Sequence, residues 1–89
     1  MENIREELQS HYDTELLFAD DWDDCIIGVS NDFGKLRVVY SVSSMIDQLM
    51  SYGDTYHEAI DYLEYNTLNT WVGENTPIYV EIDNEKHQK

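Results

Sequence analysis

The middle of the chain reads CIIGVS at Cys25–Ser30, NDFGK at Asn31–Lys35 and LRVVY at Leu36–Tyr40. The outer two segments are β-branched or apolar and of strand length, while the segment between them is rich in turn-forming residues. This order predicts a β-hairpin whose connection is longer than two residues. Within the connection, Gly34 supplies the positive φ that a turn requires.

Two helices are predicted after the hairpin. Apolar residues within Met45–Met50 recur at helical spacing, with Ser41, Ser43 or Ser44 as the cap and Gly53 as the stop. A second helix begins at the Thr-x-x-Glu capping box at residues 55–58, in which a hydroxyl and a carboxylate satisfy the first turn. Its expected buried stripe is Tyr56, Ala59, Ile60, Leu63 and Thr67.

The remaining segments complete one small domain, residues 1–89. Residues 1–24 form an acidic N-terminal segment in which Ile4, Leu8 and His11 fit one stripe of a short helix and residues 16–18 could dock onto the core. Residues 25–82 form the core, with Ile78–Ile82 as a final strand, and residues 83–89 form a polar tail. We therefore expect an α+β fold, a small antiparallel or mixed sheet with two to three helices on one face.

Charge narrows the class of partner. Nineteen Asp and Glu face five Lys and Arg, which gives a net charge of −14 over 89 residues. Such a surface repels phosphate backbones and anionic lipid, and it is attracted to basic protein surfaces. We therefore expect no direct nucleic-acid or membrane partner. Apolar residues at 42 % are enough for a modest core.

The compartment is expected to be the cytoplasm. The single cysteine, Cys25, cannot form an internal disulfide and is interpreted as a buried structural thiol. The acidic start at Met1–Glu7 differs from the basic start of a signal peptide. No apolar run approaches the roughly 20 residues needed to span a bilayer.

Four carboxylates surround an indole at Asp20, Asp21, Trp22, Asp23 and Asp24. This run has three interpretations: a metal site, a negatively charged binding patch with Trp22 as its anchor, or a solvated loop. The alternating spacing and the glycine of a Ca²⁺ loop are missing, so we expect no metal and no cofactor. A second set of carboxylates surrounds the start and middle of the second predicted helix; it comprises Asp54, Glu58, Asp61 and Glu64.

Catalytic patterns are weak, and we expect the protein not to be an enzyme. The segment Asp32–Gly34 matches a kinase magnesium motif only in its letters, and His11, His57 and His87 lack metal-binding spacing. Asn66 and Thr67 interrupt an apolar stripe. Their side chains either bond free backbone groups at the helix end or contact a ligand.

The segments Glu58–Thr67 and Trp71–Ile78 resemble a family of small phage and prophage proteins, mostly uncharacterised, with Tyr65-Asn66-Thr67 and Thr76-Pro77-Ile78 as the more distinctive parts. The resemblance covers roughly residues 25–82. It implies a phage or prophage origin and a compact fold, and it transfers no catalytic residue.

Together these observations predict a phage-encoded acidic inhibitor that occupies the basic surface of a host nucleic-acid-binding defence protein, of the anti-CRISPR or anti-restriction type and by DNA mimicry, in the host cytoplasm. The alternative is a small homo-oligomeric, for instance homodimeric, accessory or structural protein of the phage, whose charge serves only solubility.

Overall fold

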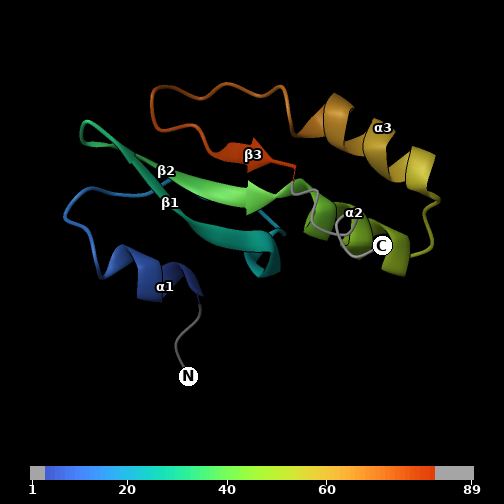
Figure 1. Cartoon of the computed structure of the whole chain (residues 1–89), viewed down its shortest axis with the longest axis horizontal. Helices are drawn as coiled ribbons and strands as arrows, with labels where there is room; N and C mark the ends of the chain where they lie inside the picture. The colour runs from blue at the N-terminus through green and yellow to red at the C-terminus, as the bar shows by residue number, and fades with distance from the viewer. Residues whose placement is uncertain (1–3, 82–89) are drawn as a thin grey trace, which may run out of the picture.

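The computed structural model describes residues 4–81 (Figure 1). Its elements in chain order are α1 (Ile4–Gln9), the 3₁₀ turn η1 (Asp23–Cys25), β1 (Ile26–Asp32), β2 (Lys35–Ser41), α2 (Val42–Ser51), α3 (Tyr56–Asn66) and β3 (Ile78–Val80). The sheet has the order β1-β2-β3, with β1 antiparallel and β3 parallel to β2. The expected α+β class, in its mixed-sheet form, is confirmed. The predicted polar tail and Ile82, the last residue of the predicted final strand, lie outside the described residues.

The hairpin is present, but its turn is tighter than expected. β1 and β2 continue to Asp32 and Lys35, which pair with each other and leave only Phe33 and Gly34 between the strands. Both turn residues have positive φ, 55° and 86°, as a type I′ turn requires. The Asn31 side chain supports the turn, because its Oδ1 accepts a hydrogen bond from the Gly34 N–H at 2.9 Å. The longer connection predicted from the polar residues was therefore wrong.

Both predicted helices begin at their expected caps. Ser41 caps α2 by accepting a hydrogen bond from the Ser44 N–H, and the chain leaves that helix through Gly53, with φ of 115°. At α3 the capping box is complete: Thr55 Oγ1 accepts from the Glu58 N–H, and Glu58 Oε1 accepts from the Thr55 N–H at 2.9 Å. Glu58 thus has a structural role in addition to its charge.

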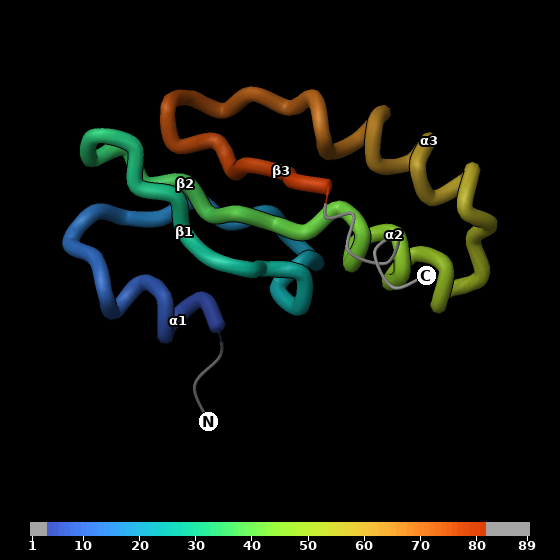
Figure 2. The backbone as a smooth tube through the Cα atoms, in the orientation of Figure 1, coloured from blue at the N-terminus to red at the C-terminus, as the bar shows by residue number. Residues whose placement is uncertain are grey.

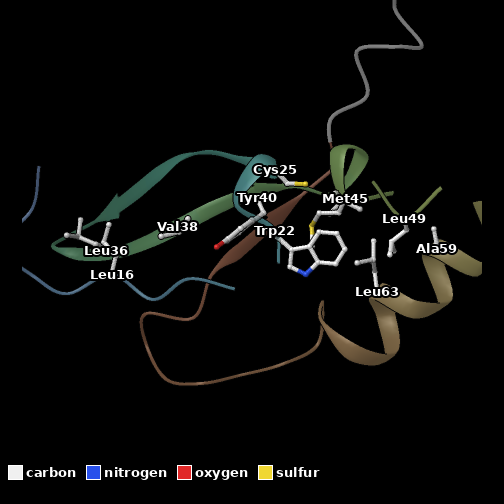
Figure 3. Packing of buried hydrophobic residues seen from close by; sticks show 11 residues of the cluster. Leu16, Trp22, Cys25, Leu36, Val38, Tyr40, Met45, Leu49, Ala59 and Leu63 are labelled. Carbon is white, nitrogen blue, oxygen red and sulfur yellow. The ribbon is translucent and has the colours of Figure 1, made fainter. Parts of the chain in front are cut away.

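The core is formed by side chains from one face of the sheet, from the N-terminal segment and from helices α2 and α3. β2 contributes Leu36, Val38 and Tyr40, which alternate along the strand and are all buried. Figure 3 shows Leu16 beside Leu36 at one end of this row, and Trp22 between Tyr40 and the helical residues at the other. The helical contribution is Met45, Leu49, Ala59 and Leu63. An irregular segment therefore covers much of the sheet face, a task usually performed by a helix.

A long connection leads from α3 to β3. Figure 2 shows it running back along the sheet toward the hairpin before it turns into β3. It is attached to β2 by three contacts: Asn75 Nδ2 donates to the Leu36 carbonyl at 2.9 Å, Arg37 Nε donates to the Thr76 carbonyl at 2.6 Å, and Lys35 pairs with Glu74 at 4.0 Å. These contacts give the connection a fixed position beside the core. No helix within residues 4–81 is long and apolar enough to cross a membrane.

Candidate functional site: an acidic pocket at the end of a helix

Trp22 is part of the core. Only 6 % of its surface is exposed, and it packs in the cluster that contains Tyr40, Met45 and Leu63. Trp22 therefore does not project from the surface, but it lines the pocket described below, so its predicted contact with a partner stays a prediction. The neighbouring Asp21 is exposed, while the indole packs between Tyr40 and the helical residues Met45 and Leu63 (Figure 3).

Three hydrogen bonds fix the chain just before Trp22. The Ala19 N–H donates to the Tyr40 hydroxyl at 2.7 Å, and Gln48 Nε2 donates to the Asp21 carbonyl at 2.9 Å. Arg5 Nη2 donates to the Ala19 carbonyl at 3.2 Å, and the Arg5 guanidinium also lies 5.2 Å from the centre of the Phe18 ring. The segment is thus hydrogen-bonded to the sheet, to α2 and to α1.

The four carboxylates around Trp22 divide into different environments. Asp23 accepts a 2.8 Å hydrogen bond from Arg5 Nε, and this bond raises the pKa of Arg5. Asp20 lies 3.7 Å from the same guanidinium, yet its side chain is 92 % exposed, so the pair is weak. Asp21 is exposed, has φ of 75°, and forms no ion pair with any residue in the described range. Asp24 is exposed on η1.

A pocket of about 650 Å³ lies between this segment, the end of α3 and the long connection. We call it the central pocket. Its floor contains the buried residues Trp22, Leu49 and Pro77, and its exposed rim includes Asp20 and Asp21. The volume is within the range of roughly 300–1,000 Å³ typical of ligand pockets.

The end of α3 contributes a polar wall to the central pocket, formed by Asn66, Thr67 and Thr70. The Asn66 side chain donates to the Tyr62 carbonyl, one turn earlier in α3, at 3.0 Å. Asn66 and Thr67 also line the pocket, so the ligand-contact interpretation remains open for both.

A second hollow, which we call the α3 hollow, follows the outer flank of α3. It is lined by Glu58, Asp61, Glu64 and Tyr65, and by Tyr62 and Asn66. Tyr62 and Asn66 also line the central pocket, so the two hollows share a border. Residues three and four apart are neighbours on a helix, which is why residues 58, 61, 62 and 65 come together here.

The structure thus places five of the predicted carboxylates on the lining of the two hollows, which share Tyr62. We define Asp20, Asp21, Glu58, Asp61 and Glu64 as the acidic rim. No Lys or Arg is found among the described residues that line either hollow. Asp23, Asp24 and Asp54 line neither of them, and Asp23 is engaged by Arg5.

Sequence reasoning missed most of the pocket's walls. Thr70, Val72, Pro77 and Tyr79 line it although they belong to a connection and a short strand far from Asp20 in sequence. The only local signal was the polar pair Asn66 and Thr67 on an otherwise apolar stripe. Of that stripe, Ala59 and Leu63 are buried, whereas Tyr56 is 54 % exposed and does not belong to the core.

Large exposed apolar groups lie on or next to the lining of the two hollows: Tyr65 lines the α3 hollow, and Val72, which follows Trp71 in the chain, lines the central pocket. Tyr65 is 90 % exposed and Trp71 is 68 % exposed, and Val72 beside Trp71 is exposed as well. Tyrosine and tryptophan combine an apolar ring with a polar atom, a property that enriches them in contact surfaces. The acidic rim is therefore accompanied by groups that can pack on a partner.

Among residues 4–81, no group of three or more His, Cys, Asp or Glu is placed to hold a metal ion. Cys25 is buried, and burial raises the pKa of its thiol, an effect that the nearby charges of Asp24 and Asp47 reinforce. A neutral thiol of this kind is a poor nucleophile, in agreement with its interpretation as a structural residue.

Comparison with models of protein families, with curated proteins and with solved structures finds no match to this chain.

Proposed function

We propose that this protein is an acidic binding protein that occupies the basic surface of a nucleic-acid-binding protein and thereby blocks it. It acts without catalysis. Its origin is a phage or prophage, its site of action is the host cytoplasm, and its target is a defence protein of the type that anti-CRISPR or anti-restriction proteins inhibit. The acidic rim imitates the phosphates that the target's Arg and Lys side chains normally contact.

The proposal rests on the position of the acidic-rim carboxylates around two adjoining hollows. Carboxylates from two segments far apart in sequence, Asp20 with Asp21 and Asp61 with Glu64, border one continuous pair of hollows. A net charge of −14 spread evenly would serve solubility alone, whereas charge gathered around a concave surface favours recognition. The exposed Tyr65, which lines the α3 hollow, supplies packing area beside the charge.

The proposal is tested by capture of partners on the tagged protein from bacterial lysate. Bound proteins are eluted with a salt gradient or with double-stranded DNA, and are identified by mass spectrometry. The expected result is a nucleic-acid-binding protein released at moderate salt and displaced by DNA, since both reagents compete for the same basic groups. A partner that resists DNA, or recovery of the bait alone, would argue against mimicry in the host used.

A second candidate is favoured by the exposed apolar groups. Trp71, Val72 and Tyr65 could instead form a self-association surface of a homo-oligomeric accessory protein. Light scattering at low and high salt separates the candidates. A dimer held by these residues would strengthen as salt screens the repulsion between two highly acidic copies, and Trp71→Ser would dissociate it.

A further inference from the structure

The central pocket carries features that favour one kind of occupant. Its rim bears the carboxylates of Asp20 and Asp21, and Asp21 has no cationic partner among the described residues. Its polar wall is the carboxyl end of α3, where the aligned peptide dipoles place a partial negative charge. The last turn of α3 contains no basic residue to offset that charge. Two independent sources of negative potential therefore act on the same cavity.

Aromatic and neutral polar groups complete the lining. Trp22 and Tyr62 are among the lining residues, and flat cations bind favourably against aromatic rings. Asn66, Thr67 and Thr70 add amide and hydroxyl oxygens that can accept hydrogen bonds. A planar cation with several N–H donors and an aliphatic stem matches this combination of charge, rings and acceptors.

We propose that the central pocket receives an arginine side chain of the basic partner. This inference rests on the proposed function and deepens it, because it identifies the chemistry by which the partner is anchored. The guanidinium lies between the Asp20 and Asp21 carboxylates and the end of α3, and its stem contacts the Trp22 and Tyr62 rings. The outer carboxylates of the α3 hollow contact neighbouring basic groups on the partner's surface.

The test needs no partner protein and uses three capped tripeptides, Gly-Arg-Gly, Gly-Lys-Gly and Gly-citrulline-Gly. Citrulline keeps the shape of arginine and lacks its charge, whereas lysine keeps the charge and lacks the planar group. Each peptide is titrated into the full chain labelled with ¹⁵N, and the amide signals are followed. We expect saturable shifts for Gly-Arg-Gly, concentrated at Asp21, Thr67 and Thr70, with weaker binding of the lysine peptide and none of the citrulline peptide.

Two double variants make the test specific. Asp20→Asn with Asp21→Asn removes both rim carboxylates, and Asn tolerates the positive φ at position 21. Asp32→Asn with Asp47→Asn removes the same number of charges from exposed positions that do not line the pocket. We expect the first variant to weaken Gly-Arg-Gly binding about tenfold, the effect of losing a charged hydrogen-bond partner, and the control to bind within about twofold of the unmodified protein.

Equal responses to the arginine and lysine peptides, spread over the whole acidic surface and reduced alike by both double variants, would overturn the inference. That result leaves the outcome of the capture experiment untouched, so failure of the pocket and failure of the proposed function are distinguishable. Conversely, selective Gly-Arg-Gly binding together with an empty capture would support a guanidinium site and reject the nucleic-acid-binding partner.

Discussion

The Tyr40 hydroxyl accepts a 2.7 Å hydrogen bond from the backbone N–H of Ala19. Tyr40 is fully buried on the central strand, and Ala19 belongs to the irregular segment that leads to Asp20, Asp21 and Trp22. This contact therefore links the core of the sheet to the acidic side of the central pocket. The position of the pocket depends on it, since the segment has no helix or strand of its own between α1 and η1.

Replacement of Tyr40 by Phe is expected to lower the free energy of unfolding by about 1–3 kcal/mol, because the Ala19 N–H loses its partner. Urea denaturation measures this change. Tyr79→Phe is the matched control: its ring stacks on Tyr40 at 5.6 Å, and no partner for its hydroxyl is found in the described part of the chain. Equal effects of the two variants would show that the Ala19 contact contributes nothing to stability.

Stability is expected to fall at high pH. Burial raises the pKa of Tyr40 to about 12 from an ordinary value of 10.0. The unfolded chain then releases this proton at a lower pH than the folded chain, so the unfolding free energy decreases from about pH 10 to about pH 12. A difference of about two pKa units corresponds to about 3 kcal/mol in full. The unfolding free energy of the Tyr40→Phe variant, measured across the same pH range, should not show this decrease. An identical pH dependence in the two proteins would contradict the assignment of the decrease to Tyr40.

The two tryptophans are expected to respond oppositely to a soluble quencher. Trp22 is 6 % exposed and Trp71 is 68 % exposed. Trp71→Phe should leave a blue-shifted emission that acrylamide quenches poorly, whereas Trp22→Phe should leave a red-shifted emission that acrylamide quenches readily. Trp22→Phe should also be the destabilising change, since it shrinks a core side chain. Ready quenching of Trp22 in the Trp71→Phe variant would contradict its place in the core.

The hairpin turn offers a stabilising substitution. Phe33 is 100 % exposed and has a φ of 55°, a conformation that side chains other than Asn and Asp adopt at a cost. We expect Phe33→Asn, which creates the Asn-Gly pair preferred in type I′ turns, to raise the unfolding free energy by about 1 kcal/mol. Phe33→Ala is the control, because alanine pays the same backbone cost. A gain in both variants would assign the effect to loss of the exposed ring.

The parts of the fold that depend on residues close together in the chain could be predicted from the sequence. The capping box at Thr55 and Glu58, the stop at Gly53 and the β-branched or apolar run Leu36–Tyr40 are signals of this kind, and the structure has the expected cap, helix end and strand at these positions. The hairpin turn was predicted to be too long because Asp32 and Lys35, on either side of Phe33 and Gly34, are polar and were assigned to the turn. In the structure these two residues pair with each other as the last residues of the strands.

The candidate site could be predicted only in part, since its geometry depends on long-range contacts. Trp22 is enclosed by carboxylates in sequence, which suggests solvent, yet packing against Tyr40 and Met45 buries it. The central pocket joins residues near 20, 66 and 76, and no periodicity relates these segments. The acidic residues were identified from composition, but the division between the acidic rim and the bound Asp23 required the position of Arg5.

The most direct measurement compares two variants of equal net charge in binding to the captured partner. One neutralises the acidic rim with Asp20→Asn, Asp21→Asn, Asp61→Asn and Glu64→Gln, and keeps Glu58 because it caps α3. The other carries Glu7→Gln, Asp13→Asn, Asp32→Asn and Asp47→Asn at exposed positions outside both hollows. Neutralising four carboxylates changes the net charge from −14 to −10 in each.

Affinity is measured by calorimetry at several salt concentrations. We predict that the rim variant loses affinity at least about 100-fold and that its affinity depends less steeply on salt. The other variant should stay within about fivefold of the unmodified protein. The two differ because rim carboxylates contact the partner directly, whereas distant charges act only through screened long-range attraction. Equal losses in the two variants would contradict the account, because binding would then follow total charge and not the acidic rim.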